Sequence, residues 1–240
     1  MDRGIWATWY DLPEEGKDEY IDWLHGVYLP GMLRRPGYLW AAHMDNVKTE
    51  EREQEINARL AHTTDPSVPR GNGYLLLFGA VSPAVFLNPS PAQLEEKWTV
   101  EECDMFRRRS GVRSCIFLEQ NRVDGPEAKK RAPGLTPGPM IQMGSFNINA
   151  LENEEEMGAW YTQMRYPRLK TVEGCVGMRK LVSVSGWAKH AVIYEFLSLE
   201  DIQDYLSKEL GAEEWSRRMV GNLVHAPGSP SQGRRIWPPA

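Results

Sequence analysis

Hydrophobic residues recur with helical spacing in two segments of the chain that also resemble each other. The first segment, residues 20–44, reads YIDWLHGVYLPGMLRRPGYLWAAHM, and the second, residues 157–181, reads MGAWYTQMRYPRLKTVEGCVGMRKL. Their landmarks align at one constant offset without a gap: Trp23 with Trp160, Pro30 with Pro167, and Gly37 with Gly174. A repeat of this length is a whole domain rather than a solenoid unit. The chain is therefore interpreted as a tandem duplication.

Each segment predicts a helix, a turn and a strand. Apolar residues at i, i+3, i+4 and i+7 form one face of an amphipathic helix. A proline cannot continue an undistorted helix, and a glycine tolerates the positive φ of a helix exit, so the helix ends near the proline. The predicted buried stripes consist of Tyr20, Trp23, Leu24 and Val27 in the first copy, and Met157, Trp160, Tyr161 and Met164 in the second.

The rest of the pattern predicts the same order of elements in both halves. Strands are expected at 5–10, 38–44, 74–80 and 114–120, and again at 143–149, 175–184 and 189–197, with helices at 48–60, 92–109, 154–170 and from 198. Residues 234–239 predict a short final edge strand, where proline is tolerated.

The element order predicts an α+β fold made of two ferredoxin-like βαββαβ repeats. We expect an N-terminal repeat at 1–122, a linker rich in proline and glycine at 123–139, and a C-terminal repeat at 140–240. One such repeat leaves one face of its sheet bare. Packing the two bare faces sheet to sheet would bury both of them.

Composition narrows the range of partners. The formal net charge of −5 argues against nucleic acid and an anionic membrane as partners. No apolar run approaches the roughly 20 residues of a membrane span, and the first residues lack the apolar centre of a signal peptide. Three widely spaced cysteines without a CxxC pair are typical of free thiols in a reducing compartment. We expect a cytoplasmic protein, and both a monomer and a homodimer agree with the pattern.

The helix that ends WLHGVYLP, followed by PGY and a strand, resembles the EthD-like group of the dimeric α/β barrel superfamily. The resemblance covers both halves in element order, and it implies that the two sheets form one barrel. EthD-like proteins commonly carry a histidine two positions before the helix-end proline. This chain has Tyr28 there in the first copy and Arg165 in the second. On a wheel of about 100° per residue both lie at the rim of the stripe, whereas His25 points toward solvent or a partner subunit.

Alternation along the first strand of each half predicts which side chains line the barrel. The apolar positions Ile5, Ala7 and Trp9 are expected to face the helices. Polar groups sealed in a dry core are costly, so we expect the opposite face to border water or ligand inside the barrel. The alternative is a strand face open to solvent. The residues on that face are Trp6, Thr8, Tyr10, Ser145, Asn147 and Asn149.

Histidines complete the candidate chemistry. His43 lies near the end of the second strand, and His190 opens a later strand with Tyr194 on the same face. A histidine and a tyrosine facing one cavity suit proton transfer near neutral pH. His62 and His225 fall in predicted loops. We expect no metal site, because the sequence has no HExxH, CxxC, GxGxxG, P-loop or GxSxG motif.

Three functions follow from the pattern and the resemblance. The first is a cofactor-independent lyase or isomerase that decarboxylates, dehydrates or rearranges an aromatic or polyketide-like carbonyl compound by proton transfer. Its catalytic residues would be Tyr28, His43, Arg165 and His190, with Tyr194 and the predicted barrel lining binding the substrate. The second is a haem enzyme of the chlorite dismutase-like kind, with His190 or His225 as the axial ligand. The third is a non-catalytic, EthD-like binding or accessory protein.

Overall fold

The computed structural model describes residues 2–47, 49–131, 137–209 and 213–239. Residue 48, where a helix was predicted to begin, and the middle of the predicted linker lie outside these ranges. In the first half the long strands are β1 (Gly4–Asp11), β2 (Tyr38–Asn46), β4 (Tyr74–Ala80) and β5 (Ser110–Asp124). In the second half they are β6 (Met140–Ile148), β7 (Cys175–Ser185), β8 (His190–Phe196) and β10 (Ser231–Trp237).

Within the described ranges these strands close into a barrel. They follow the order β10-β2-β4-β1-β5-β7-β8-β6, and β6 pairs again with β10. Each half supplies one antiparallel sheet, and the pairs β5–β7 and β10–β2 join the two sheets. The predicted α+β fold of two ferredoxin-like repeats packed sheet to sheet is confirmed. The prediction of an edge strand at 234–239 is wrong, because β10 is paired on both sides and a closed barrel has no edge there.

The interior of the barrel is an apolar core. Ile5, Ala7 and Trp9 of β1 meet Ile141 and Met143 of β6 there, each at most 1% exposed. Fully burying a side chain of the size of Ile5 contributes roughly 1.5–3 kcal/mol. Apolar packing therefore holds the two sheets together, and the expectation that these β1 residues face the helices is wrong.

Charged side chains occupy one part of this interior. Arg179 of β7 donates to Asp2 Oδ2 at 2.6 Å through Nη1 and to Glu195 Oε1 at 3.1 Å through Nε. All three residues are fully buried. Removing one member of such a pair leaves an uncompensated charge at a cost of about 3–5 kcal/mol. The network ties the start of the chain to the strands of the second half.

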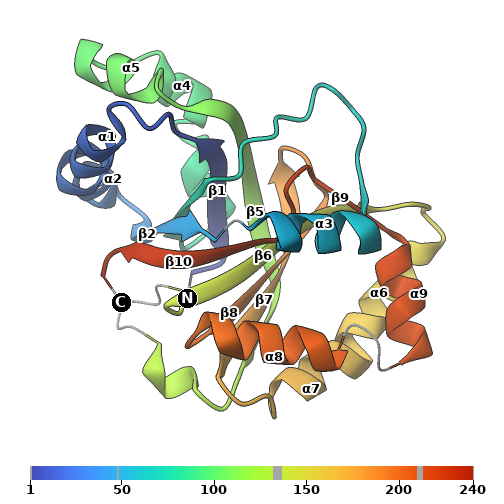
Figure 1. Cartoon of the computed structure of the whole chain (residues 1–240). Helices are drawn as coiled ribbons and strands as arrows, with labels where there is room; N and C mark the ends of the chain where they lie inside the picture. Colours follow the sequence, from blue (N-terminus) through green and yellow to red (C-terminus); the bar gives the residue numbers. More distant parts are fainter. Residues whose placement is uncertain (1, 48, 132–136, 210–212, 240) are drawn as a thin grey trace.

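Helices cover the outer faces of the two sheets (Figure 1). The first half has α1 (Lys17–Trp23), α2 (Leu29–Leu33), α4 (Pro91–Glu95) and α5 (Val100–Phe106). The second half has α6 (Asn153–Trp160), α7 (Tyr166–Leu169), α8 (Leu199–Glu209) and α9 (Glu214–Gly221). Within the described ranges, no helix combines the length and the apolar character that crossing a bilayer requires.

A π-helical turn interrupts the repeated helix in each half. Residues Leu24–Tyr28 connect α1 to α2, and Tyr161–Arg165 connect α6 to α7. A π turn holds more residues than an α turn, so the side chains after it depart from the wheel of a regular helix. Tyr28 and Arg165 are therefore buried, whereas Val27, which was predicted in the buried stripe, is 56% exposed.

The first half carries an insertion, residues 47–73, between β2 and β4. It contains α3 (Glu50–Arg59) and the short strand β3 (Ala61–His62), which pairs in parallel with β9 (Leu223–His225) of the second half. Figure 1 shows α3 lying across the junction of β10 and β9. The equivalent connection in the second half, between β7 and β8, is only a short loop. A segment of the first half thus extends over the second.

Candidate active site

Two clusters of titratable side chains lie between sheet and helices, one in each half. The first-half cluster consists of Tyr10, Tyr20, His25, His43 and Arg109. The second-half cluster consists of Glu154, Arg165, Lys180, His190 and Tyr194. The structure therefore divides the four predicted catalytic residues into two pairs: Tyr28 and His43 in the first half, and Arg165 and His190 in the second.

Hydrogen bonds connect the first-half cluster from the core to the surface. The hydroxyl of Tyr10 lies 2.8 Å from Nε2 of His43, and Nδ1 of His43 lies 2.8 Å from Nε2 of His25. Tyr10 and His43 are fully buried, and His25 is half-buried on the π turn. A protonatable path thus runs from β1 through β2 to the outside of the protein.

Burial keeps the members of this path uncharged. It lowers the pKa of His43 well below the usual histidine range, and the neighbouring His25 and Arg109 lower it further. Burial also lowers the pKa of His25 and raises that of Tyr10 well above the usual tyrosine range. A neutral imidazole has one donor and one acceptor nitrogen, so the path can hold its protons in two arrangements. Switching between them moves a proton along the path.

Arg109 places a cation beside Tyr10. Its guanidinium carbon lies 4.3 Å from the centre of the Tyr10 ring and 4.4 Å from that of Phe106. Its Nε donates to the hydroxyl of Tyr20, which in turn lies 3.4 Å from the hydroxyl of Tyr10. Its Nη2 is buried and has no hydrogen-bond partner in the described part of the chain. An unused cationic N–H at this position can receive an oxyanion.

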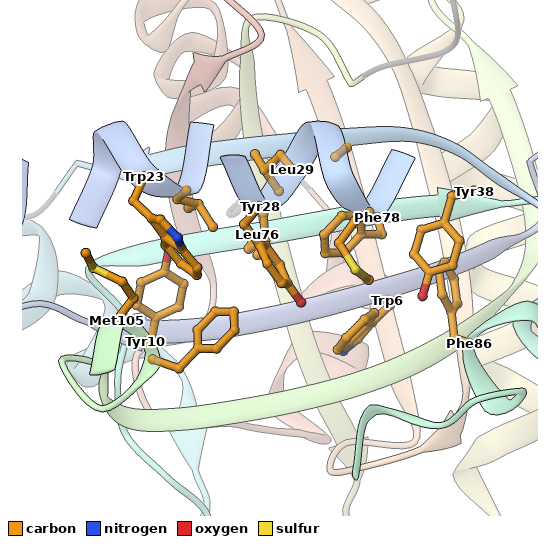
Figure 2. Close-up of a cluster of buried hydrophobic side chains, with 14 of the residues drawn as sticks. Trp6, Tyr10, Trp23, Tyr28, Leu29, Tyr38, Leu76, Phe78, Phe86 and Met105 are labelled. Atoms are coloured by element: carbon orange, nitrogen blue, oxygen red, sulfur yellow. The ribbon is translucent and has the colours of Figure 1, made fainter. Parts of the chain in front are cut away.

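Tyr28 and Trp6 lie in the same layer between sheet and helix (Figure 2). Tyr28 extends from the π turn toward the sheet, its ring 5.5 Å from Trp23 and 4.8 Å from Phe106. Burial raises the pKa of Tyr28 above the usual tyrosine range. It therefore stays a neutral phenol in an aromatic wall.

The predicted barrel lining from the first half is wrong in its position. Trp6 and Tyr10 pack against the helices, and alternation places Thr8 on the same face of β1. The indole Nε1 of Trp6 donates to Ser114 Oγ at 2.7 Å. The opposite face of β1, with Ile5, Ala7 and Trp9, lines the barrel instead.

In the second half the hydrogen-bonded chain contains a lysine. Lys180 Nζ lies 3.1 Å from His190 Nδ1, and His190 Nε2 lies 3.0 Å from Glu154 Oε2. Burial lowers the pKa of Lys180 to about 7, and burial followed by the charge of Lys180 lowers that of His190 to about 4. Lys180 occupies the place that His43 has in the first half.

Arg165 is enclosed by aromatic rings. Its Nη2 donates to the hydroxyl of Tyr194 at 2.8 Å, and its guanidinium carbon lies 5.2 Å from the Trp160 ring and 5.3 Å from the Tyr205 ring. Arg165 is 7% exposed. It is therefore part of the core at the end of the repeated helix, and Tyr194 is its direct partner.

The predicted binding residues around β6 join neither cluster. The Ser145 N–H donates to Ser229 Oγ at 2.8 Å, and Asn147 Oδ1 accepts the Lys189 N–H at 2.7 Å. Alternation places Ser145 and Asn147 on the barrel-facing side of β6. Asn149 lies beyond the end of β6, within hydrogen-bond distance of Asn222. These contacts are structural links between neighbouring segments.

Sequence reasoning missed His25, Arg109 and Lys180 as members of the clusters. His25 was assigned to the surface because the helical wheel cannot anticipate a π turn. Lys180 carried a usable signal, since it stands opposite His43 in the duplicated segments. His225 was assigned to a solvated loop, but it lies on β9 and is 5% exposed.

The histidines suggested for haem do not fit that role. Both ring nitrogens of His190 are within hydrogen-bond distance of partners, Lys180 on one side and Glu154 on the other. His225 packs against Phe146 and His62, with ring centres 5.6 and 5.8 Å away. Among the described residues, no three histidine, cysteine or acidic side chains are grouped so as to hold a metal ion.

Sequence comparison gives no relatives: no protein-family model matches the chain, and no curated protein matches it. Solved structures do match its fold. An anthrone oxidase-like protein superposes with a TM-score of 0.62 at 11% identity, covering 98% of this chain and 91% of its own.

Two further structures have the same fold. A proposed monooxygenase from Fusobacterium nucleatum subsp. nucleatum superposes with a TM-score of 0.57 at 8% identity, covering 98% of this chain and 93% of its own. A proposed chlorite dismutase superposes with a TM-score of 0.55 at 12% identity, covering 98% and 96%. The chain therefore has the dimeric α/β barrel fold that its sequence resembles, and at such identities the likeness concerns the fold alone.

Proposed function

We propose that the chain is an enzyme that transfers a proton to or from a small aromatic or carbonyl compound at the first-half cluster. The observation that carries this proposal is the path from Tyr10 through His43 to His25, with the unused Nη2 of Arg109 beside it. His43 is the acid–base group, and His25 exchanges its proton with solvent. Arg109 supplies the positive charge.

The chemistry follows from these roles. Once the ring of His25 is displaced from Nδ1, neutral His43 takes a proton at that nitrogen from an O–H group, or from a C–H group next to a carbonyl. The electron pair of the broken bond moves onto the substrate oxygen. The Nη2–H of Arg109 stabilises the resulting oxyanion. Such a step is common to decarboxylation, dehydration and rearrangement of phenolic or polyketide-like substrates. A cofactor-independent lyase or isomerase is the activity that this arrangement favours most.

Substrate enters from the outer end of the path. There the ring of Trp237 lies 6.3 Å from that of His25, and Trp237 pairs with His43 in the register of β10 and β2. Both side chains are partly exposed, whereas His43 behind them is fully buried. Displacement of these two rings would open the way to His43, and their return would exclude water during proton transfer.

The second-half cluster is less suited to this reaction. Its basic group, Lys180, is held between His190 and the carbonyl of Leu181, and its other neighbours are the rings of Phe146 and Tyr161. The arginine of this half, Arg165, already donates to Tyr194. Turnover is therefore assigned to the first-half cluster alone.

Exchange of an acidic C–H in deuterated buffer tests the proposal directly. Anthrone, an aromatic ketone with such a C–H group, is incubated with the protein, and loss of its proton signal is followed by NMR. The wild type should accelerate exchange, and His43→Gln should reduce that acceleration about a hundredfold or more. His190→Gln is the matched control and should retain it. Equal rates for His43→Gln and the wild type would refute the assignment.

Oxygen dependence separates the reaction classes. A lyase or isomerase turns over a hydroxylated aromatic ketone equally well in argon-purged and in air-saturated buffer, since no electrons leave the substrate. Turnover that requires oxygen would instead identify an oxygenase using the same proton-transfer step. A Soret band in the purified protein would contradict a cofactor-independent reaction of either kind.

A further inference from the structure

A second candidate site lies away from both clusters, beneath the insertion of the first half. A partly open cavity of about 330 Å³ is bordered by the end of β2, by α3 and β3, by the loop that follows β3, and by the connection from β9 to β10. A volume near 300 Å³ is at the lower end of the range for small-molecule pockets. The cavity thus has room for a compact organic molecule.

Three hydrogen bonds fix the polar lining. Asn46 Nδ2 donates to the carbonyl of Asn72 at 3.0 Å, and Asn72 Nδ2 donates to the carbonyl of Gly228 at 2.8 Å. His62 Nε2 lies 2.8 Å from the carbonyl of Ser229 and must therefore donate to it. Backbone carbonyls accept only, so these bonds set the orientation of both amides and of the imidazole. The lining is preorganised by contacts between the two halves.

The fixed lining offers a hydrogen-bond acceptor. With Nε2 donating to Ser229, a neutral His62 has a lone pair left on Nδ1. A donor group on a ligand would therefore find a partner in the lining.

The charge of the lining is positive. Arg70 is the charged residue that borders the cavity, and no carboxylate or lysine is among the residues that line it. Arg70 is exposed, and it makes no ion pair with any carboxylate in the described ranges. Val47 and Ile56 supply an apolar wall. The combination favours an organic anion with an apolar body.

We propose that this cavity binds a small hydroxylated carboxylic acid. The carboxylate pairs with Arg70, the hydroxyl donates to Nδ1 of His62, and the body of the molecule packs against Val47 and Ile56. The site is independent of the first-half cluster. It explains why a polar insertion is present in one half only and reaches across to the other: the insertion encloses a ligand as well as bridging the halves.

Binding of 4-hydroxybenzoate tests the site. Titration calorimetry should show saturable binding to the wild type, and a ¹³C-labelled Ile56 methyl group should shift during a parallel NMR titration. Arg70→Met should weaken binding about tenfold or more, because a charge-assisted hydrogen bond to the carboxylate is lost. The neutral methyl ester of 4-hydroxybenzoate should bind the wild-type protein about tenfold more weakly than the free acid does.

Two control variants show whether the loss of affinity is specific to the cavity. Arg59→Met removes an exposed arginine of α3 that does not line the cavity, and His43→Gln alters only the first-half cluster; neither should change the affinity. Absence of binding, an unshifted Ile56 signal, or an Arg70→Met variant that binds like the wild type would each overturn the proposal. These experiments measure binding and not catalysis, so a negative result would leave the proposed function unaffected.

Discussion

The Nε2 atom of His25 lies 2.8 Å from the Nδ1 atom of His43, although His25 is on a helix and His43 is on a strand. The π turn of residues Leu24–Tyr28 makes this contact. In a regular helix, His25 would point off the buried stripe and away from the sheet. The irregular turn therefore converts a surface position into the outer end of a proton path.

Replacing His25 should impair turnover. His25→Phe keeps an aromatic ring at the π turn but removes the hydrogen bond to His43, so protons released at His43 no longer reach solvent efficiently. We expect at least a tenfold fall in the rate of anthrone C–H exchange, with little change in the free energy of unfolding. Partial rescue by added imidazole would support a relay role. A variant with wild-type exchange would show that His43 exchanges protons by another route.

Shortening the π turn provides a second test. Gly26 is exposed, and an added Cβ there would have no heavy atom within 4 Å, so its deletion removes no packing. With one residue fewer, a regular α turn keeps Tyr28 in the buried stripe but turns His25 away from His43. We expect a folded protein that has lost C–H exchange. Deleting Gln163 from the matching turn of the second half should leave exchange intact, and equal effects of both deletions would argue against a special role for the first turn.

Arg165 should matter for stability. Arg165→Met removes the donor to the buried Tyr194 hydroxyl and the cation among three rings. We expect the free energy of unfolding to fall by about 1–3 kcal/mol in urea titrations. Lys170→Met, on the exposed surface nearby, should change it by less than about 0.5 kcal/mol. A stable Arg165→Met variant that loses activity would reverse this assignment and return Arg165 to the active site.

Lys180 should produce a pH dependence of stability. Its pKa is about 7 in the folded protein and 10.5 when unperturbed, so between these values the unfolded chain binds a proton that the folded chain has released. Stability from this group therefore rises with pH across that window, by up to about 1.4 kcal/mol per unit. We expect Lys180→Met to have a higher free energy of unfolding than the wild type at pH 7. On the order of 2 kcal/mol of this difference should be lost by pH 9. An advantage that is constant in urea titrations at both pH values would contradict the low pKa.

The fold could be predicted from the repeated helix and the order of elements, but the facing of β1 could not. Both faces of this strand are covered, one by helices and one by the opposite sheet, so Trp6 and Trp9 are equally acceptable on either side by hydrophobicity alone. Because side chains alternate, an error of one position places every side chain of the strand on the wrong face of the sheet. The polar residues of β6 then suggested the wrong side for β1, the equivalent strand of the first half.

The candidate site was only partly predictable for a different reason. His43 and Tyr10 could be recognised as chemically suitable residues, but their contact depends on the pairing of β1, β4 and β2. Arg109 precedes β5 and approaches Tyr10 only when β5 pairs with β1. Such contacts between distant segments leave no local signal in the sequence.

The fusion of two similar halves into one barrel also affects how the protein can change. In a barrel assembled from two identical chains, every substitution appears twice, and a change that suits one site is imposed on the other. Here the equivalent positions already hold His43 in one half and Lys180 in the other. One covalent chain lets natural selection act on each site separately, so one half can specialise in chemistry while its counterpart accumulates substitutions that favour assembly.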